Sequence, residues 1–303
     1  MKLAKRLRKS SQNFNMIKPT TISEYLLFST VRIAVQLSSG EQRTGTGFFF
    51  NFLVDEDHRN IPAIITNKHV VAGAVTGSFQ LHELDKTIEK PQPSGDFITV
   101  GFDDFENLWA FHPDNNVDLC AMLFKPIRSE AETQGKSIFY YPIDNSFILS
   151  KADLEELSAV EEVLMIGYPN GLWDDVNNLP LIRRGTTATH PAVDFQGRST
   201  NVIDAACFPG SSGSPVLIVN EGGTYSTKSG TFTGYKRVVL LGVLFEGPLM
   251  TAQGEIVIQT IPTSQQPISL TRLMIHLGYI VQAKEIKVLG EHIKQILQAS
   301  GNL

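Results

Sequence analysis

Residues 208–219 read FPGSSGSPVLIV, a turn rich in glycine and serine that leads directly into an apolar strand. A nucleophilic serine needs such a turn, because the turn projects the serine oxygen and brings backbone N–H groups beside it. Gly210 and Gly213 flank Ser212 and permit the backbone conformations that the turn requires. An ordinary surface turn has the same composition, so this stretch becomes informative only together with the rest of the sequence.

Two further segments supply the partners that a nucleophilic serine requires. Residues 64–71 read IITNKHVV, so His69 follows the end of an apolar strand, which can hold a general base firmly. Residues 115–122 read NNVDLCAM, and Asp118 precedes a strand of buried character. From that edge, a carboxylate can accept the N–H of the histidine and fix its tautomer. Either motif alone would fit a structural histidine or a turn aspartate.

The order of these motifs along the chain distinguishes between known arrangements of such residues. The order here is His69, Asp118, Ser212, as in the chymotrypsin arrangement, whereas subtilisin has Asp, His, Ser and the α/β-hydrolases have Ser, acid, His. The hydrolase pattern G-x-S-x-G also fails, because Ser214 occupies the position of its second glycine. Among the other histidines, His112 is kept as a reserve candidate for the base.

The composition and the spacing of apolar residues indicate a globular protein made of short strands. The chain of 303 residues is 42% hydrophobic and 19% charged, and its 24 glycines and 15 prolines indicate many turns. Short apolar runs bounded by turn residues recur, and several connections are too short for the helices of a parallel sheet. Near the C-terminus, apolar residues at helical spacing predict a helix that docks on the second half: Ile286, Leu289, Ile293 and Ile296.

Charge and cysteine content limit the partners and the compartment. The first 20 residues carry six Lys or Arg and no acid, although the whole chain has a net charge of -5. We expect no nucleic-acid partner, because the remainder of the chain is acidic, while the basic arm is available to an acidic partner. No apolar run has the length of a membrane span or of an export signal. Two cysteines, Cys120 and Cys207, make no disulfide framework, which favours a cytoplasmic location.

Together, these motifs make the sequence resemble the trypsin-like peptidases, and within them the bacterial branch close to the high-temperature-requirement (HtrA) proteases. The resemblance covers about residues 26–298, and further short matches support it: Thr46-Gly47-Phe48, Gly167-Tyr168-Pro169, residues 204–215 and Leu241-Gly242-Val243. It implies an all-β fold of two antiparallel six-stranded β-barrels, with the three residues in the cleft between them, and a C-terminal helix.

The expected organisation has five parts. They are a basic N-terminal arm (1–24), an N-terminal barrel (25–149), an inter-barrel connection (150–162), a C-terminal barrel (163–283) and a C-terminal helix with a tail (284–303). On this division, no region of the sequence is left for the PDZ domain of many HtrA-like proteins. No pattern in the sequence predicts a metal ion or a cofactor.

The resemblance also implies a role for each site residue in a serine endopeptidase acting on protein or peptide substrates. Ser212 would form the acyl-enzyme, His69 would act as base and then acid, and Asp118 would orient the histidine. The backbone N–H groups of Gly210 and Ser212 would form the oxyanion hole. The pocket for the residue before the cut would be lined by Ala206, Cys207, Phe245, Glu246 and Gly247. Because Ala206 replaces the acid of trypsin, we expect a small or medium apolar residue there, whereas an inward-pointing Glu246 carboxylate would instead recruit a basic side chain.

Two departures from the family pattern leave other functions open. Ser211 stands where trypsin-like zymogens have an acid, and Ser214 replaces a usual glycine. One alternative is a catalytically silent module that binds extended peptides in the same cleft. Another is an esterase or acyltransferase for a non-peptide substrate. A silent binder has no physical need for all three groups, which favours the peptidase.

Overall fold

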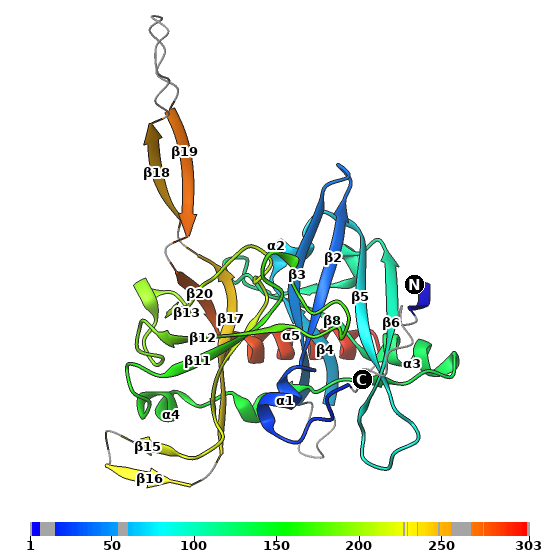
Figure 1. The fold of residues 1–303 in the computed structure, drawn as a ribbon, viewed down its shortest axis with the longest axis horizontal. Helices are drawn as coiled ribbons and strands as arrows, with labels where there is room; N and C mark the ends of the chain where they lie inside the picture. The colour runs from blue at the N-terminus through cyan, green and yellow to red at the C-terminus, as the bar shows by residue number, and fades with distance from the viewer. Residues whose placement is uncertain are drawn as a thin grey trace, which may run out of the picture.

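The computed structural model has two strand-rich halves side by side, with a hairpin that projects from the second half (Figure 1). The structure describes residues 2–6, 16–53, 60–226, 228, 230–234, 236–247, 249–255, 268–274 and 276–301. The two halves share part of the core, and this junction is the part of the fold that positions the candidate site.

The first half contains one sheet of ten strands. Eight of them are in the order β1-β6-β5-β2-β3-β4-β8-β7, while β9 pairs with β5 and β10 pairs with β3. All described pairings in this sheet are antiparallel except that of β10 with β3. The bounds are β1 (Lys2–Arg6), β2 (Thr30–Leu37), β3 (Gln42–Leu53), β4 (Asn60–Thr66), β5 (Ala74–Leu84), β6 (Pro93–Asp103), β7 (Ala110–Phe111), β8 (Cys120–Leu123), β9 (Ile138–Phe139) and β10 (Ile143–Asp144).

The second half is a closed barrel of six antiparallel strands, in the order β11-β12-β13-β20-β17-β14. Its strands are β11 (Glu162–Gly167), β12 (Leu181–Thr187), β13 (Thr200–Asp204), β14 (Pro215–Asn220), β17 (Arg237–Glu246) and β20 (Leu277–Gln282). Two hairpins extend from the barrel strands: β15 (Thr224–Ser226) with β16 (Thr231–Thr233), and β18 (Leu249–Glu255) with β19 (Ile268–Met274).

Helices in the described residues are few and mostly short. The α-helices are α1 (Ile22–Leu26), α2 (Lys68–Val71), α3 (Lys125–Thr133), α4 (Lys151–Glu155) and α5 (Lys284–Ala299), and the 3-10 turns are η1 (Glu106–Leu108), η2 (Asn145–Phe147), η3 (Pro169–Gly171) and η4 (Phe195–Gly197). Within the described ranges, none of these helices has the length and apolar character needed to cross a membrane.

Strand β3 is buried on both faces, because it lies between two parts of the core. Successive side chains of a strand point to opposite faces. Phe48 and Phe50 accordingly pack into a core that includes residues from the second barrel, whereas Phe49 packs into the interior of the first half. This double burial explains the run of phenylalanines after Gly47, where an amphipathic strand would alternate with polar residues.

The C-terminal helix α5 contacts both halves. Its buried residues Ile286, Leu289 and Ile293 join the core shared by the two halves. Gly290 lies against β3 so closely that a Cβ there would be 2.5 Å from the ring of Phe52. The expected helix is therefore present and docks on the second half as predicted, and it also contacts β3 of the first half. Ile296, assigned by its spacing to the apolar face, is 46% exposed.

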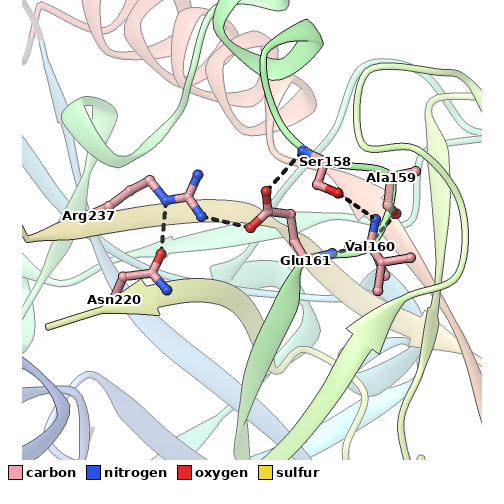
Figure 2. Close-up of polar contacts among 7 residues, drawn as sticks. Ser158, Ala159, Val160, Glu161, Asn220 and Arg237 are labelled. Carbon is pink, nitrogen blue, oxygen red and sulfur yellow. Dashed lines mark hydrogen bonds and ion pairs between the residues drawn. The ribbon is translucent and has the colours of Figure 1, made fainter. Parts of the chain in front are cut away.

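Helix α4 and the anchored loop after it precede β11, within the segment expected to connect the barrels. Glu161 then receives a hydrogen bond from the Ser158 backbone N–H (2.9 Å) and an ion pair from Arg237 of β17 (2.7 Å), as Figure 2 shows. Arg237 also donates to the Asn220 side chain of β14 (2.9 Å). These contacts fix the start of the second barrel against its own strands.

The all-β fold class with a C-terminal helix is confirmed, and the second half is the predicted six-stranded barrel. The first half has ten strands rather than six, because β1 adds at one edge and three strands of two residues join the sheet. Pairings this short leave no periodic pattern in a sequence. Residues 7–15 of the basic arm lie outside the described residues, so its contact with an acidic partner stays a prediction. The domain boundaries also stay a prediction.

Candidate active site

Two neighbouring strand ends bring His69 and Asp118 together. Strand β4 ends at Thr66, which pairs with Cys120 at the start of β8. His69 follows β4 on the short helix α2, and Asp118 precedes β8. The His69 Nδ1 lies 2.5 Å from Asp118 Oδ2, and the His69 backbone N–H donates to Asp118 Oδ1 at 3.2 Å. The carboxylate therefore holds both the ring and the backbone of the histidine, with 48% of the histidine side chain exposed.

Two residues that precede His69 hold the aspartate loop in place. The buried Asn67 donates from its side-chain amide to the Asp118 carbonyl at 2.7 Å. Lys68 donates to the Asp114 carbonyl at 2.8 Å. Sequence analysis did not assign a role to either residue, although both lie in the quoted IITNKHVV segment. Their contacts make the short segment that carries Asp118 part of the same unit as His69.

Of the three serines in the nucleophile turn, only Ser212 has an accessible side chain. Ser211 is 1% exposed and Ser214 is 0% exposed, whereas Ser212 is partly exposed. A nucleophile has to reach its substrate, so accessibility favours Ser212. Gly210 and Gly213 have positive φ angles of 84° and 86°, which glycine adopts freely and other residues rarely do. The backbone that the sequence predicts for this turn is present.

The nucleophile turn is bonded directly to the half of the molecule that carries His69. The Thr46 backbone N–H on β3 donates to the Ser212 carbonyl at 2.9 Å. The Thr46 carbonyl in turn accepts from the hydroxyl of Thr66 at 2.7 Å, and Thr66 lies three positions before His69. No hydrogen bond joins the Ser212 side chain to His69 in the described part of the chain. Catalytic hydrogen bonds are often long before substrate binds and shorten in the substrate complex.

The backbone N–H groups of Gly210 and Ser212 are available to a negatively charged oxygen. The Pro209 carbonyl accepts a hydrogen bond from the Asn170 N–H at 2.5 Å. The two groups of a trans peptide point in opposite directions, so the Gly210 N–H points away from Asn170. Among the residues that the structure describes, no protein acceptor binds the N–H of Gly210 or of Ser212. This arrangement suits an oxyanion hole.

The side chain of Thr46 holds the nucleophile turn in place, and sequence analysis gave this residue no role. Thr46 is fully buried. Its hydroxyl donates to the Gly210 carbonyl at 3.0 Å and accepts from the Tyr168 N–H at 3.1 Å. The partners lie 164 and 122 positions away along the chain. Only the match of Thr46-Gly47-Phe48 to the family pattern pointed to this position.

We expect Thr46→Val to lower the free energy of unfolding and to slow catalysis. The substitution keeps the shape but leaves the Gly210 carbonyl and the Tyr168 N–H without their partner, at about 1–3 kcal/mol for each buried group. Urea unfolding and kcat/KM measure the two effects, and the loss of kcat/KM should be about tenfold or more. Thr30→Val is the matched control, since the buried Thr30 hydroxyl has no hydrogen-bond partner. Equal behaviour of the two variants would contradict this role of Thr46.

A comparison with known families agrees with this geometry. The sequence matches the model of the trypsin-like peptidase domain over residues 45–224, which is more than half of the chain. The chain belongs to this family. The matched range contains all three residues of the candidate triad and ends after β14. A search among curated proteins found no match.

Several solved structures of proteases are similar to this trypsin-like peptidase at low identity. The Rv3671c protease from M. tuberculosis in its active form is 15% identical over 93% of this chain and 91% of that chain, with a TM-score of 0.39. An HtrA-type protease, AlgW with a tripeptide, is 14% identical over 91% of this chain and 62% of that chain, with a TM-score of 0.41. The HL collagenase structure is 14% identical over 95% of this chain and 98% of that chain, with a TM-score of 0.43.

The residues predicted to line a specificity pocket differ in their exposure. Cys207 is buried, Ala206 and Phe245 are partly buried, and Glu246 is exposed. Gly278 on β20 is also part of this region, since a Cβ there would lie 2.5 Å from the Cys207 sulfur. The fifth predicted residue, Gly247, follows the end of β17 and is partly buried.

An aromatic neighbour of the pocket residues was also missed. The Tyr279 ring on β20 lies 6.5 Å from that of Phe245 and stacks on Phe195 at 6.0 Å. Sequence analysis missed Gly278 and Tyr279 because they belong to a strand that is distant from the nucleophile turn along the chain.

We expect both cysteine thiols of the folded trypsin-like peptidase to be unreactive. Cys120 and Cys207 are free and buried. Burial raises the pKa of Cys207 to about 11 and that of Cys120 well above its ordinary value, and the thiolate is the reactive form. Iodoacetamide should therefore modify neither thiol at pH 7.5 until urea unfolds the protein, and reducing agents should leave activity unchanged. Rapid labelling of Cys207 in folded protein would contradict this.

His112, the reserve candidate for the base, is buried away from the candidate triad. Its side chain is 1% exposed, and its Nε2 lies 3.4 Å from a carboxylate oxygen of Glu285 on α5. Its Nδ1 accepts from the Asp114 N–H at 3.1 Å. The Nδ1 of His112 therefore binds the loop that carries Asp118, while the Nε2 faces Glu285 of helix α5 without a hydrogen bond.

Burial lowers the pKa of His112, against smaller opposite effects from Asp114 and Glu285, and this gives a pH prediction. The unfolded chain binds a proton at about pH 6.5 and the folded protein only at lower pH. The stability contributed by neutral His112 is thus present above about pH 6.5 and is lost as the pH falls through the folded pKa. Urea unfolding between pH 7.5 and 5 should show this loss, and His112→Gln should reduce it. An unchanged pH dependence in His112→Gln would contradict the assignment.

Proposed function

We propose that the protein is a serine endopeptidase that hydrolyses peptide bonds through an acyl-enzyme on Ser212. The observation that carries the proposal is the doubly held pair of His69 and Asp118, in a unit that is bonded through Thr66 and Thr46 to Ser212, the only accessible serine of the nucleophile turn. A binding module has no need for a histidine fixed by a carboxylate together with an accessible serine hydroxyl.

In the proposed reaction, Asp118, His69 and Ser212 move a proton while the substrate carbonyl is attacked. The Asp118 carboxylate accepts the Nδ1–H of His69, which leaves Nε2 free to take the proton of the Ser212 hydroxyl. The Ser212 oxygen then bonds to the carbonyl carbon of the substrate, and the carbonyl oxygen gains the negative charge. The N–H groups of Gly210 and Ser212 stabilise that oxygen, an effect worth about 2.7–4 kcal/mol for a single donor.

Collapse of this intermediate breaks the peptide C–N bond. His69 donates its proton to the leaving amine, and the acyl group remains on Ser212 as an ester. Water then attacks the ester carbon, with His69 again as the base, and the acid product leaves as the Ser212 hydroxyl re-forms. His69 gains a proton in each attack and gives it up as each leaving group departs, so it is neutral again after acylation and after hydrolysis of the ester, and Asp118 stays ionised throughout.

The substrate side of the proposal uses the strand edge at the end of β17. An extended peptide would pair with residues 245–247 and place the side chain before the cut beside Ala206, Cys207 and Gly278. An apolar residue of small or medium size suits these neighbours. The free thiols of Cys120 and Cys207 also support the predicted cytoplasmic location, which is part of this proposal.

A fluorophosphonate probe tests the function directly, because it labels only a serine that is activated as a nucleophile. We expect stoichiometric labelling of the folded protein, with the modified residue mapped to Ser212 by mass spectrometry. Ser211→Ala and Ser214→Ala are the matched controls and should label normally. A folded protein that takes up no probe would overturn the proposal in favour of a silent binding module. Labelling together with hydrolysis of esters but of no peptide would favour the esterase or acyltransferase.

A further inference from the structure

Arg32 is a half-buried cation that has no counter-ion among the described residues. It lies on the face of β2 that points away from the first core, with its guanidinium 4.2 Å from the centre of the Trp173 ring. Within the described part of the chain, no carboxylate and no hydrogen-bond acceptor contacts Arg32, and its buried Nε has no partner. Burial lowers the pKa of this guanidinium, but arginine stays charged in proteins. A desolvated charge without a partner is unfavourable, and an anion would relieve it.

This cation lies close to the candidate catalytic centre. Gly171 connects the two places, because a Cβ on Gly171 would be 3.5 Å from the Arg32 Nη2 and 3.3 Å from the Thr44 hydroxyl. On its other side, the Gly171 N–H lies 3.1 Å from the Cβ position of Gly210. Arg32 is thus separated from the proposed oxyanion donor by one glycine residue. A side chain on Gly171 would contact both Arg32 and Thr44, so the glycine keeps this space open.

A polar cavity of about 330 Å³ starts at Arg32 and continues over the outer face of the sheet. It is lined mainly by Arg32, Gln36, Gln42, Arg43, Thr44 and Ser78 of β2, β3 and β5. The middle of this face carries small side chains. Ala34 of β2 pairs with Thr44 of β3 on one side and with Ser78 of β5 on the other. Arg43 is already paired with Glu41 at 2.7 Å. The unpaired charge of the cavity is therefore that of Arg32.

The position of the cavity decides which part of a substrate reaches it. In the proposed function, the acyl side of an extended peptide pairs with residues 245–247, and its scissile carbonyl meets Gly210 and Ser212. The chain after the cut would then pass Gly210, whose Cβ position lies 3.1 Å from the Gly171 nitrogen, and would continue toward Arg32 on the other side of Gly171. On this path, the cavity with Arg32 would receive residues of the leaving-group side.

We propose that Arg32, with the hydroxyl of Thr44, forms a leaving-group-side subsite that selects substrates carrying a carboxylate a few residues after the cut. The inference rests on the proposed function for the direction of the peptide. The carboxylate has two sources, an Asp or Glu side chain or the C-terminus of a short substrate. A charge-assisted hydrogen bond to a guanidinium contributes enough to raise kcat/KM by about 10- to 100-fold.

Matched peptides test the selection. Mass spectrometry first locates the cut in a cleaved peptide. One pair of derivatives of this peptide then carries Asp or Asn at the second or third residue after the cut, and another pair has a free or an amidated C-terminus. We expect the wild type to favour the carboxylate member of a pair by about tenfold or more in kcat/KM. Arg32→Gln should lose this preference and hydrolyse the neutral member as the wild type does. Arg128→Gln, on α3 and outside the cavity, is the matched control and should keep it. No preference in the wild type, or its persistence in Arg32→Gln, would overturn the subsite.

A binding measurement separates the failure of the subsite from the failure of the proposed function. The indole of Trp173 lies under Arg32 and reports on it by fluorescence, whereas Trp109 is buried in the first half. A short peptide with an acidic residue, added to Ser212→Ala, should change the Trp173 signal, and its amide counterpart should not. Trp173→Phe identifies the source of the signal, and Arg32→Met keeps the packing if Arg32→Gln folds poorly. Carboxylate binding without peptide hydrolysis by the wild type would support the subsite and contradict the proposed peptidase function. Peptide hydrolysis without carboxylate binding would support the peptidase function and contradict the subsite.

Discussion

Ser212→Ala is expected to lower kcat/KM for peptide hydrolysis by at least about ten-thousandfold, which corresponds to about 5 kcal/mol of transition-state free energy. The substitution removes the attacking oxygen and leaves the oxyanion donors and the peptide-binding edge in place. Residual hydrolysis should therefore remain above the rate in water. A fluorogenic peptide assay measures the loss, and urea unfolding should show a nearly unchanged free energy, because the Ser212 side chain makes no hydrogen bond within the described residues.

The neighbouring serines and the other triad members provide controls for this result. Ser211→Ala and Ser214→Ala remove buried hydroxyls that have no partner, so both variants should keep their activity. Asp118→Asn should also cost about ten-thousandfold, because the amide cannot hold His69 in the required tautomer. The double variant Ser212→Ala with Asp118→Asn should be no worse than Ser212→Ala alone, since residues that act as a unit are not additive. An inactive Ser214→Ala beside an active Ser212→Ala would move the nucleophile to Ser214.

The sequence was most informative where a short segment carries both a residue and its setting. The three candidate catalytic motifs each combine one reactive residue with a neighbouring strand end, and the two that meet in the first half, His69 and Asp118, lie next to the paired ends of β4 and β8. Part of the closed second barrel was predictable for a related reason, because β11, β14, β17 and β20 are apolar runs bounded by turns, whereas β12 (LIRRGTT) is not. The family match over residues 45–224 covers the same motifs.

The contacts that join distant segments could not be predicted. Thr46 is one buried threonine among many, and nothing around it in the sequence indicates bonds to Gly210 and Tyr168. Helix α5 shows an apolar stripe, but a stripe does not say which surface covers it. Its contact with β3 depends on the absence of a side chain at Gly290. The setting of Arg32 could not be predicted either, because a charged residue on a strand is usually solvated. Only the structure places Arg32 beside Trp173.

Gly213→Ala is expected to be the most damaging single-methyl substitution in the site. A Cβ on Gly213 would lie 1.9 Å from the Thr46 carbonyl oxygen and 2.4 Å from the Thr66 hydroxyl oxygen, where no real Cβ fits. The positive φ of 86° adds about 1–2 kcal/mol for a residue with a side chain, and overpacking adds about 1–3 kcal/mol. The free energy of unfolding should fall by about 2–5 kcal/mol. Activity should fall by at least a hundredfold, because the clash moves β3 and the nucleophile turn apart.

Gly135→Ala separates the two causes of this loss. Gly135 has a similar φ of 71°, but its Cβ position has no heavy atom within 4 Å. Urea unfolding of Gly135→Ala should therefore show only the conformational cost of about 1–2 kcal/mol, with full peptide hydrolysis. The excess loss in Gly213→Ala then measures the clash with Thr46 and Thr66, the two residues that join the nucleophile turn to the half carrying His69. Equal stability of the two variants, with activity retained in both, would mean that this junction does not position Ser212.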